Sequence, residues 1–181
     1  DAHGPSSRVR GLAVGDCLRR LVSKTLAQQF QQEFTDAVSP HQFGLAVRSG
    51  IDAAIHLVRT KTDADPSLTL TQIDGVGAFD HIHRATMLQG VANLPTAHRL
   101  MPYLKMYYGS PSEYIWHDCQ GQPHVVEQGE GGEQGDSLMP ALFSIGLAEA
   151  LKAAQATLEP NETLFAYLDD TYILSAPERA L

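Results

Sequence analysis

The 181-residue sequence is poor in several features that assign a protein to a class at once. It has no apolar run near the roughly 20 residues that a membrane-spanning helix needs, and its start, DAHGPSSRVR, lacks the charged-then-apolar pattern of a secretory signal. Its two cysteines are too few for a disulfide framework. We therefore expect an intracellular protein, nuclear or cytoplasmic, which is not secreted and has no membrane partner.

Positive charge is also scarce. Lys and Arg total 13 against 21 Asp and Glu, which gives a net charge of −8. Because a nucleic-acid-binding face is usually basic, this balance argues mildly against such a partner. The apolar content of 43 % nevertheless suffices for a folded core. The sequence has no initiator Met, so we expect it to be a piece of a longer protein.

Apolar periodicity predicts two helices in the first third of the sequence. The first is expected over residues 14–34, with Asp16 as the N-cap. Its apolar face consists of Val14, Leu18, Leu21, Val22, Leu26, Phe30 and Phe34. The second begins near Ser49, which has capping-box spacing to Asp52, and ends before a loop at residues 60–67. Its expected apolar face is Ile51, Ala54, Ile55 and Val58.

Strands and helices alternate in the remainder. A strand over residues 68–73 runs into Asp74, and helices follow over 84–91 and 96–107. Residues 113–128 predict a hairpin that turns near Gly121, and a helix with Ser137 as its N-cap comes after it. The last two strands flank Asp169 and Asp170 at a hairpin tip. This order predicts an α+β fold, an antiparallel sheet with helices on one face.

Three aspartates stand at strand ends. If the strand before Asp74 neighbours the last hairpin, Asp74, Asp169 and Asp170 converge at one sheet edge. Adjacent buried carboxylates are costly unless a cation joins them. Carboxylates are hard ligands that suit Mg²⁺, and a pair of such ions can clamp a phosphoryl transfer. The alternative is a solvated Asp-Asp turn, which is common because Asp suits turns.

Three ordered stretches resemble the palm motifs of reverse transcriptases of the non-LTR retrotransposon and group II intron type. They are IDGVGAFDHI, GGEQGDSLMPALFSIGL and AYLDDTYIL. Upstream, RVRGLAVGDCLRRLVSKTL and PHQFGLAVRSG resemble the fingers segments of the same family. The resemblance covers nearly the whole sequence. It implies a polymerase palm at residues 67–181, a partial and mainly helical fingers region at residues 1–66, and no thumb.

The resemblance implies a metal site. Asp74 and Asp169 would hold two Mg²⁺ ions, with Mn²⁺ as a substitute, Asp170 as the third carboxylate and the Gly75 carbonyl as a backbone ligand. Phe79 would lie under the sugar of the incoming nucleotide, where its bulk would clash with a 2′-hydroxyl. Judged from the residues alone, Phe79 is equally well explained as a core aromatic.

Three further positions would bind the nucleotide. Gln134 and Gly135 would lie along the nucleotide and template, and glycine allows close backbone approach. Arg10 would contact the triphosphate through its planar, permanently charged group. The family pattern R-P-I reads Arg10-Gly11-Leu12 here, so the register of Arg10 is open, and a solvated surface arginine is the alternative.

The implied activity is that of an RNA-directed DNA polymerase. This nucleotidyltransferase adds deoxynucleotides to a primer 3′-hydroxyl by a two-metal mechanism. The implied partners are an RNA template, a DNA primer and dNTPs, with a thumb and an endonuclease domain expected in the full-length protein. We expect these 181 residues alone to be inactive in processive extension, because a net charge of −8 repels phosphate.

Three other interpretations remain open. The sequence could be a decayed or domesticated copy that acts in binding or structure, which the acidic charge favours. A nucleotide cyclase or another palm-fold phosphotransferase also pairs aspartates, but the Gln-Gly pair before a helix argues against it. A zinc site at His117, Cys119 and His124 lacks both a CxxC pair and four ligands at the usual spacing.

Overall fold

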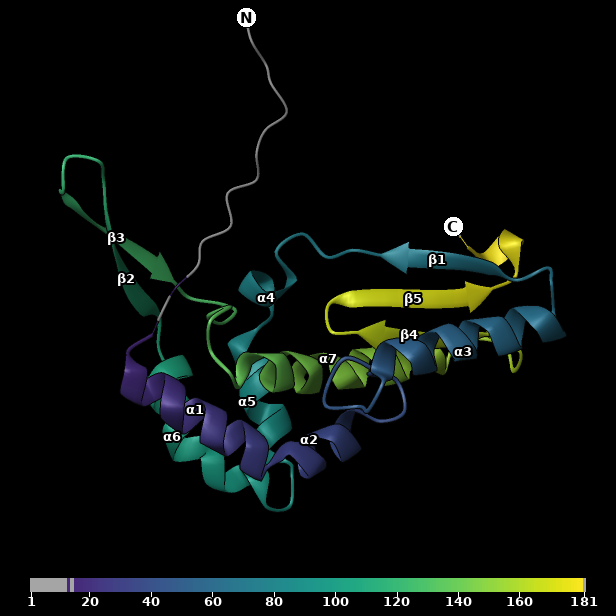
Figure 1. Ribbon diagram of the computed structural model, residues 1–181, viewed down its shortest axis with the longest axis horizontal. Coiled ribbons are helices and arrows are strands. Elements are labelled where there is room, and N and C mark those ends of the chain that lie inside the picture. The colour runs from purple at the N-terminus through teal and green to yellow at the C-terminus, as the bar shows by residue number, and fades with distance from the viewer. Residues whose placement is uncertain (1–12, 14, 181) are drawn as a thin grey trace, which may run out of the picture.

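The computed structural model describes residue 13 and residues 15–180 (Figure 1). Seven α-helices and five strands alternate along this part of the chain. In chain order the elements are α1 Cys17–Gln29, α2 Gln31–Val38, α3 Gly50–Ala64, β1 Thr69–Ile73, α4 Ala78–His81, α5 Arg84–Ala92, the 3₁₀ helix η1 Ala97–Leu100, α6 Met101–Tyr108, β2 Ser112–His117, β3 Pro123–Gln128, α7 Met139–Gln155, β4 Thr163–Tyr167, β5 Asp170–Ser175 and the 3₁₀ helix η2 Pro177–Arg179.

The main sheet is antiparallel, with the strand order β1-β5-β4. At the outer side of β4, residues 41–43 add a short parallel bridge. There the Phe43 amide donates to the Ala166 carbonyl at 2.8 Å, and the Ala166 amide donates to the His41 carbonyl at 2.7 Å. Strands β2 and β3 form a separate hairpin that projects away from the helices (Figure 1).

Helix α7 joins the sheet to a helical layer. On one side, its residue Leu151 packs against Leu164 and Ala166 of β4. On the other side, α7 packs against α5 and α2, and α6 joins the same core (Figure 1). The most deeply buried side chains of this core are Phe34, Met87, Val91, Leu104, Leu138, Met139 and Leu142. The α+β architecture expected from the sequence is therefore confirmed.

The single helix expected over residues 14–34 is wrong in two respects. Asp16 does cap it, accepting bonds from the Leu18 and Arg19 amides at 2.9 and 3.0 Å. The helix, however, ends at Gln29, and α2 begins separately at Gln31. Leu18 and Leu21 of the expected apolar face are 75 % and 62 % exposed. Near these residues the helix packs through Ser23, whose hydroxyl lies 2.8 Å from that of Tyr103. Leu26, Phe30 and Phe34 of the expected face do pack in the core.

The second helix starts where expected but lacks its capping box. Ser49 has a φ of 51°, and its side chain makes no cap bond. A capping side chain needs extended backbone at that position, so the left-handed Ser49 cannot serve. The helix also continues to Ala64 through residues expected to form a loop. Thr60 and Thr62 are accommodated there because their hydroxyls donate to the carbonyls of His56 and Val58.

The later elements follow the sequence pattern closely. Strand β1, both hairpins and α5 lie within one or two residues of their expected bounds. The helix expected over 96–107 is split into η1 and α6, with Pro102 in the first turn of α6. Ser137 is not the N-cap of α7; Leu138 is, and Pro140 is the second helical residue. No side chain caps this helix, but the Asp136 carboxylate accepts the Leu138 amide just before it at 3.0 Å. Within residues 15–180, no helix is long and apolar enough to cross a membrane.

Candidate active site

Strand pairing brings the three predicted aspartates to one end of the main sheet. Strands β1 and β5 pair in a register that ends with Ile73 opposite Thr171. Asp74 follows β1 directly and Asp170 opens β5, so residues 74 and 170 are the next positions across that ladder. Asp169 lies in the two-residue turn between β4 and β5, beside the Tyr167–Asp170 pair. Gly75 follows Asp74 in the exposed bend before α4.

The donor chemistry at this sheet end suits a hard divalent cation, because carboxylates are its preferred ligands. Asp74 is exposed, and Asp169 and Asp170 are partly exposed. The side chains do not converge, however: among the described residues, no three His, Cys, Asp or Glu side chains are grouped so that they could hold a metal ion. Gln72 of β1 donates to Asp170 Oδ1 at 3.2 Å. The metal site remains a prediction supported by backbone placement.

Phe79 lies in the short helix α4, just beyond this sheet end. Its ring stacks on that of Phe143 in α7, with centroids 4.5 Å apart. The side chain is half-buried and packs against the main core. It therefore has one face in the core and part of its surface open to solvent. The sugar contact predicted for Phe79 is compatible with this position and remains a prediction.

The loop that carries Gln134 and Gly135 is tied to α4. The Gly131 amide donates to the Ile82 carbonyl at 2.8 Å, and the Gly132 amide donates to the Phe79 carbonyl at 3.0 Å. Gly131 has a φ of 66° and lies against the backbone of residues 79 and 80, so a side chain there would collide. Gln134 is exposed, and its amide donates to Asp80 Oδ2 at 3.4 Å. Hydrogen bonds thus join the two glycine-containing motifs, IDGVGAFDHI and GGEQGDSLMPALFSIGL, directly to each other.

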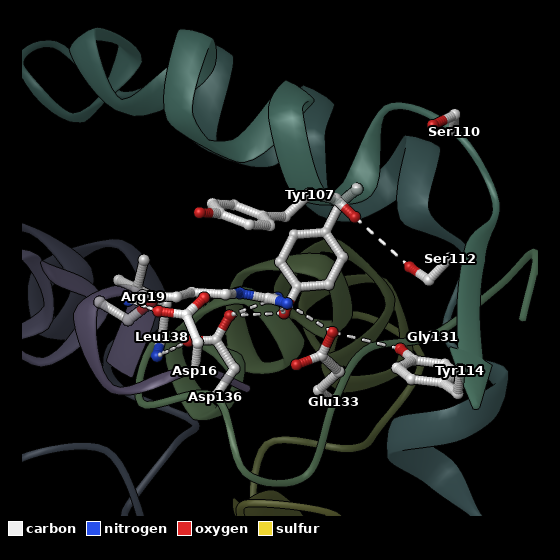
Figure 2. Close-up of polar contacts among 12 residues, drawn as sticks. Asp16, Arg19, Tyr107, Ser110, Ser112, Tyr114, Gly131, Glu133, Asp136 and Leu138 are labelled. Atoms are coloured by element: carbon white, nitrogen blue, oxygen red, sulfur yellow. Dashed lines mark hydrogen bonds and ion pairs between the residues drawn. The ribbon is translucent and has the colours of Figure 1, made fainter. Parts of the chain in front are cut away.

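A largely buried arginine anchors the same loop from α1 (Figure 2). Arg19 donates to Glu133 Oε1 at 2.6 Å and lies 3.4 Å from Asp136 Oδ2. The three side chains are 11 %, 6 % and 2 % exposed. Tyr108 donates to Asp136 Oδ2 at 2.6 Å, and the Arg19 guanidinium stacks 4.0 Å from the centroid of the Tyr107 ring. Gln134 and Gly135 therefore lie between two carboxylates that are held by one cation.

The local charges shift the protonation equilibria of this cluster. Burial lowers the pKa of Arg19, but the hydrogen bond and charge of Glu133 outweigh it, and the net pKa is raised. Burial and the Asp136 carboxylate raise the pKa of Tyr108. Burial also raises the pKa of Tyr114, whose hydroxyl donates to Glu133 at 3.3 Å. The cluster therefore holds its arginine charged and these two tyrosines neutral well above neutral pH.

A second buried arginine holds the start of the loop. Arg84 of α5 is 5 % exposed, and its Nε donates to the Gly131 carbonyl at 2.8 Å. Its two other nitrogens donate to the Ser110 carbonyl at 2.6 Å and the Ser112 hydroxyl at 3.0 Å. Arg84 thus connects the loop to the base of the β2–β3 hairpin. Anchors from α1, α5, α6 and β2 fix both ends of the Gln134–Gly135 segment.

An open cleft of about 550 Å³ lies beside the aspartates, between α3 and the face of the sheet. Its walls are Ile51, Ala54, Ile55, Val58, Arg59, Leu70, Phe165, Tyr167, Asp170 and Tyr172. The apolar face predicted for the second helix therefore lines this cleft. Ile51 and Ile55 remain 56 % and 45 % exposed.

Sequence reasoning missed the residues that support the site. Arg19, Glu133 and Asp136 had no local signal, because 114 or more residues separate Arg19 from its partners. Gln42 was missed as well, although its segment PHQFG had been noted for its family resemblance. Gly135 lies against the protein's own backbone, since a Cβ there would be 2.7 Å from the Ala13 carbonyl oxygen; its predicted contact with nucleotide and template stays a prediction. Arg10 lies outside the described residues.

Comparison with known proteins identifies the family. Residues 3–181 match the model of the family described as reverse transcriptase (RNA-dependent DNA polymerase). The chain belongs to this family. It is also similar to the retrotransposable element SLACS 132 kDa protein of Trypanosoma brucei gambiense, with 28 % identity over 174 residues. That match covers 96 % of this chain but only 14 % of the relative's length.

Solved structures show the same fold. The telomerase of Candida tropicalis, in complex with the TWJ fragment of telomeric RNA, matches 89 % of this chain and 29 % of its own, with a TM-score of 0.64 and 12 % identity. The telomerase of Candida albicans in the corresponding complex covers 90 % of this chain and 31 % of its own, with a TM-score of 0.55 and 10 % identity. At these identities the likeness concerns the fold alone. The fold class predicted from the sequence, an α+β polymerase palm with a mainly helical fingers part, is borne out.

Proposed function

We propose that this chain is the fingers and palm portion of an RNA-directed DNA polymerase from a retrotransposon. It would add deoxynucleotides to the 3′-hydroxyl of a DNA primer on an RNA template. The observation that carries the proposal is the β1–β5 register, which ends with Ile73 opposite Thr171 and so brings Asp74 beside Asp170. The retrotransposable-element relative supports the origin, and the telomerase RNA complexes support a nucleic-acid partner.

In this proposal each part of the site has one task. Asp74, Asp169 and Asp170, with the Gly75 carbonyl, would hold divalent cations, which when bound would neutralise the phosphate charge of the incoming nucleotide. The Gln134–Gly135 segment would contact the nucleotide and template, and its rigid anchoring through Glu133 and Asp136 would keep it in place. Phe79 would limit the space beside the sugar, and Arg10 would contact the triphosphate.

The division of the chain is part of the same proposal. Residues 1–66 would belong to the fingers, and residues 67–181 to the palm. The chain spans 14 % of the length of its retrotransposable-element relative. In this proposal a thumb and an endonuclease would be carried by other segments of a full-length protein. Without them we expect weak, strongly salt-sensitive nucleic-acid binding by these 181 residues.

A second candidate is a domesticated or decayed copy that binds without catalysis. Two observations favour it: the net charge of −8, and the lack of a three-ligand group among the described carboxylate, imidazole and thiol side chains. The two candidates differ in metal binding at the sheet end. A catalytic domain must hold divalent cations at Asp74 and Asp169, whereas a binding module has no such need.

The deciding experiment is Mn²⁺ titration of the folded chain, followed by paramagnetic broadening of amide signals. Signals near residues 74 and 169 should broaden first in the wild type. The double variant Asp74→Asn, Asp169→Asn should weaken Mn²⁺ binding by roughly tenfold or more, because two hard ligands are lost. A matched control, Asp52→Asn with Asp63→Asn, removes the same charge from exposed positions of α3. Equal Mn²⁺ affinity in all three proteins would refute the catalytic proposal.

A further inference from the structure

Gln42 is a buried polar side chain inserted against the turn that carries Asp169. It is 4 % exposed. Its Oε1 accepts the Leu168 amide at 2.7 Å and the Gly44 amide at 2.9 Å. Its Nε2 donates to the Leu168 carbonyl at 3.1 Å. One side-chain amide therefore binds both backbone polar groups of a single turn residue, as a neighbouring strand would.

The residue that Gln42 holds has an unusual backbone. Leu168 has a φ of 56°, in the left-handed region that is disfavoured for residues with a Cβ. It occupies the first position of the two-residue turn between Tyr167 and Asp170, and Asp169 occupies the second. The conformation of Leu168 sets the direction in which the Asp169 side chain leaves the hairpin. A branched apolar residue keeps such a conformation only where its surroundings impose it.

The chain around Gln42 is shaped for this contact. Residues 41–43 pair with β4, with Gln42 opposite Ala166, and this pairing fixes the position of Gln42 along the strand relative to the turn. Gly44 then passes so close to the hairpin that a Cβ on it would lie 2.7 Å from the Leu168 nitrogen and 2.9 Å from Leu168 Cγ. The side-chain amide of Gln42 and the lack of a side chain at Gly44 thus both allow this segment to lie directly against Leu168.

We propose that Gln42 is a positioning residue for the catalytic hairpin: it fixes the Leu168 peptide and through it the orientation of the Asp169 carboxylate. The inference rests on the proposed function, because it concerns the same aspartate. It adds a residue from outside the palm motifs, 126 positions away along the chain from its partner. Gln42 itself touches no substrate; it acts through the turn.

A glutamine at the other end of β4 provides a matched control. Gln155, at the end of α7, accepts the Leu164 amide through its Oε1 at 2.8 Å. Both glutamines thus bind the backbone of β4 or of the turn that follows it, but only Gln42 is next to Asp169. A merely structural role predicts similar consequences for the two. A positioning role predicts that the metal site responds to Gln42 alone.

The test compares Gln42→Met, Gln42→Glu and Gln155→Met in the 181-residue chain, by amide hydrogen exchange and by Mn²⁺ titration. Gln42→Met should speed exchange of the Leu168 amide and weaken Mn²⁺ binding roughly 10- to 100-fold, the usual scale for losing a supporting contact of a metal ligand. Gln155→Met should speed exchange at Leu164 and leave Mn²⁺ affinity within about twofold. Gln42→Glu keeps the acceptor and loses the donor, so its Mn²⁺ affinity should fall between those of the wild type and Gln42→Met.

Three results would overturn the inference: unchanged exchange at Leu168 in Gln42→Met, Mn²⁺ affinities that fall equally in Gln42→Met and Gln155→Met, or wild-type affinity in Gln42→Met. If Gln42→Met shows no cooperative melting, Gln42→Glu decides through Mn²⁺ affinity alone, because it keeps the acceptor for the Leu168 amide; an affinity equal to that of the wild type would then overturn the inference. Failure of the proposed function has a different signature, which is Mn²⁺ binding that survives Asp74→Asn with Asp169→Asn. In that case exchange at Leu168 alone decides whether Gln42 fixes the turn.

Discussion

Removing the Arg19 side chain should destabilise the whole domain. In Arg19→Met, Glu133 and Asp136 keep their burial but lose their cation, and the stacking of the guanidinium on the Tyr107 ring is lost as well. Breaking a buried ion pair by removing one partner typically costs about 3–5 kcal/mol. A domain of ordinary stability has only about 5–15 kcal/mol in total. We therefore expect the urea midpoint of unfolding, followed by far-UV circular dichroism, to fall steeply.

Arg20→Met is the matched control, because Arg20 is the exposed neighbour of Arg19 in the same helix. It should change the free energy of unfolding by no more than about 0.5 kcal/mol. Glu133→Gln should be less damaging than Arg19→Met, since Arg19 keeps Asp136 and the Tyr107 ring. The double variant should then lose less than the sum of the two single losses, because the residues share one network. Equal losses in Arg19→Met and Arg20→Met would refute this reasoning.

Two further outcomes are expected. In a longer form that carries a thumb, Phe79→Val should raise ribonucleotide incorporation relative to deoxynucleotide by roughly ten- to a thousandfold, measured as the ratio of kcat/KM values; loss of stability with an unchanged ratio would mean that Phe79 only packs on Phe143. Tyr108→Phe should cost about 1.5–3 kcal/mol near pH 8, because the bond to the Asp136 carboxylate is lost. The Tyr108 pKa is raised on folding, so the stability that the Tyr108 hydroxyl contributes is lost as the pH rises above about 10, the pKa of the unfolded state. Urea unfolding near pH 8 and above about pH 10 should therefore show a smaller difference in unfolding free energy between wild type and Tyr108→Phe at the higher pH. A stability difference that does not change with pH would contradict the bond between Tyr108 and Asp136.

Local patterns predicted the strands because strand residues carry their signal within a few positions. The β-forming runs on each side of Asp169 gave the final hairpin, and the run before Asp74 gave β1. The motifs also predicted correctly that β1 and the last hairpin are neighbours, which brings the backbone of Asp74 and Asp170 to the same end of the sheet. What they could not give was the direction of the aspartate side chains, because rotamers depend on contacts that the pattern does not contain.

The errors arose where tertiary contacts overrode periodicity. The apolar residues Leu18 and Leu21 indicated the wrong side of the start of α1, because the helix packs there through Arg19 and Ser23, whereas Leu26 and Phe30 pack against the core as expected. A charged residue and a serine on the buried face read as surface positions in any periodicity argument. Their burial is explained only by Glu133, Asp136 and Tyr103, which lie far along the chain. Gln42 is likewise a buried polar residue whose burial is explained only by a distant partner, Leu168 in the turn between β4 and β5.

The bridge between residues 41–43 and β4 also bears on how the chain reaches its fold. Gln42 and Arg19 are synthesised before their partners at residues 133–168, which follow 114 to 126 residues later. Closing loops of this length before any contact is rewarded slows folding, so contacts of high sequence separation imply a late, concerted assembly. A chain shortened before Leu168 would leave Gln42 without its partner in the turn and would expose strand edges that favour aggregation.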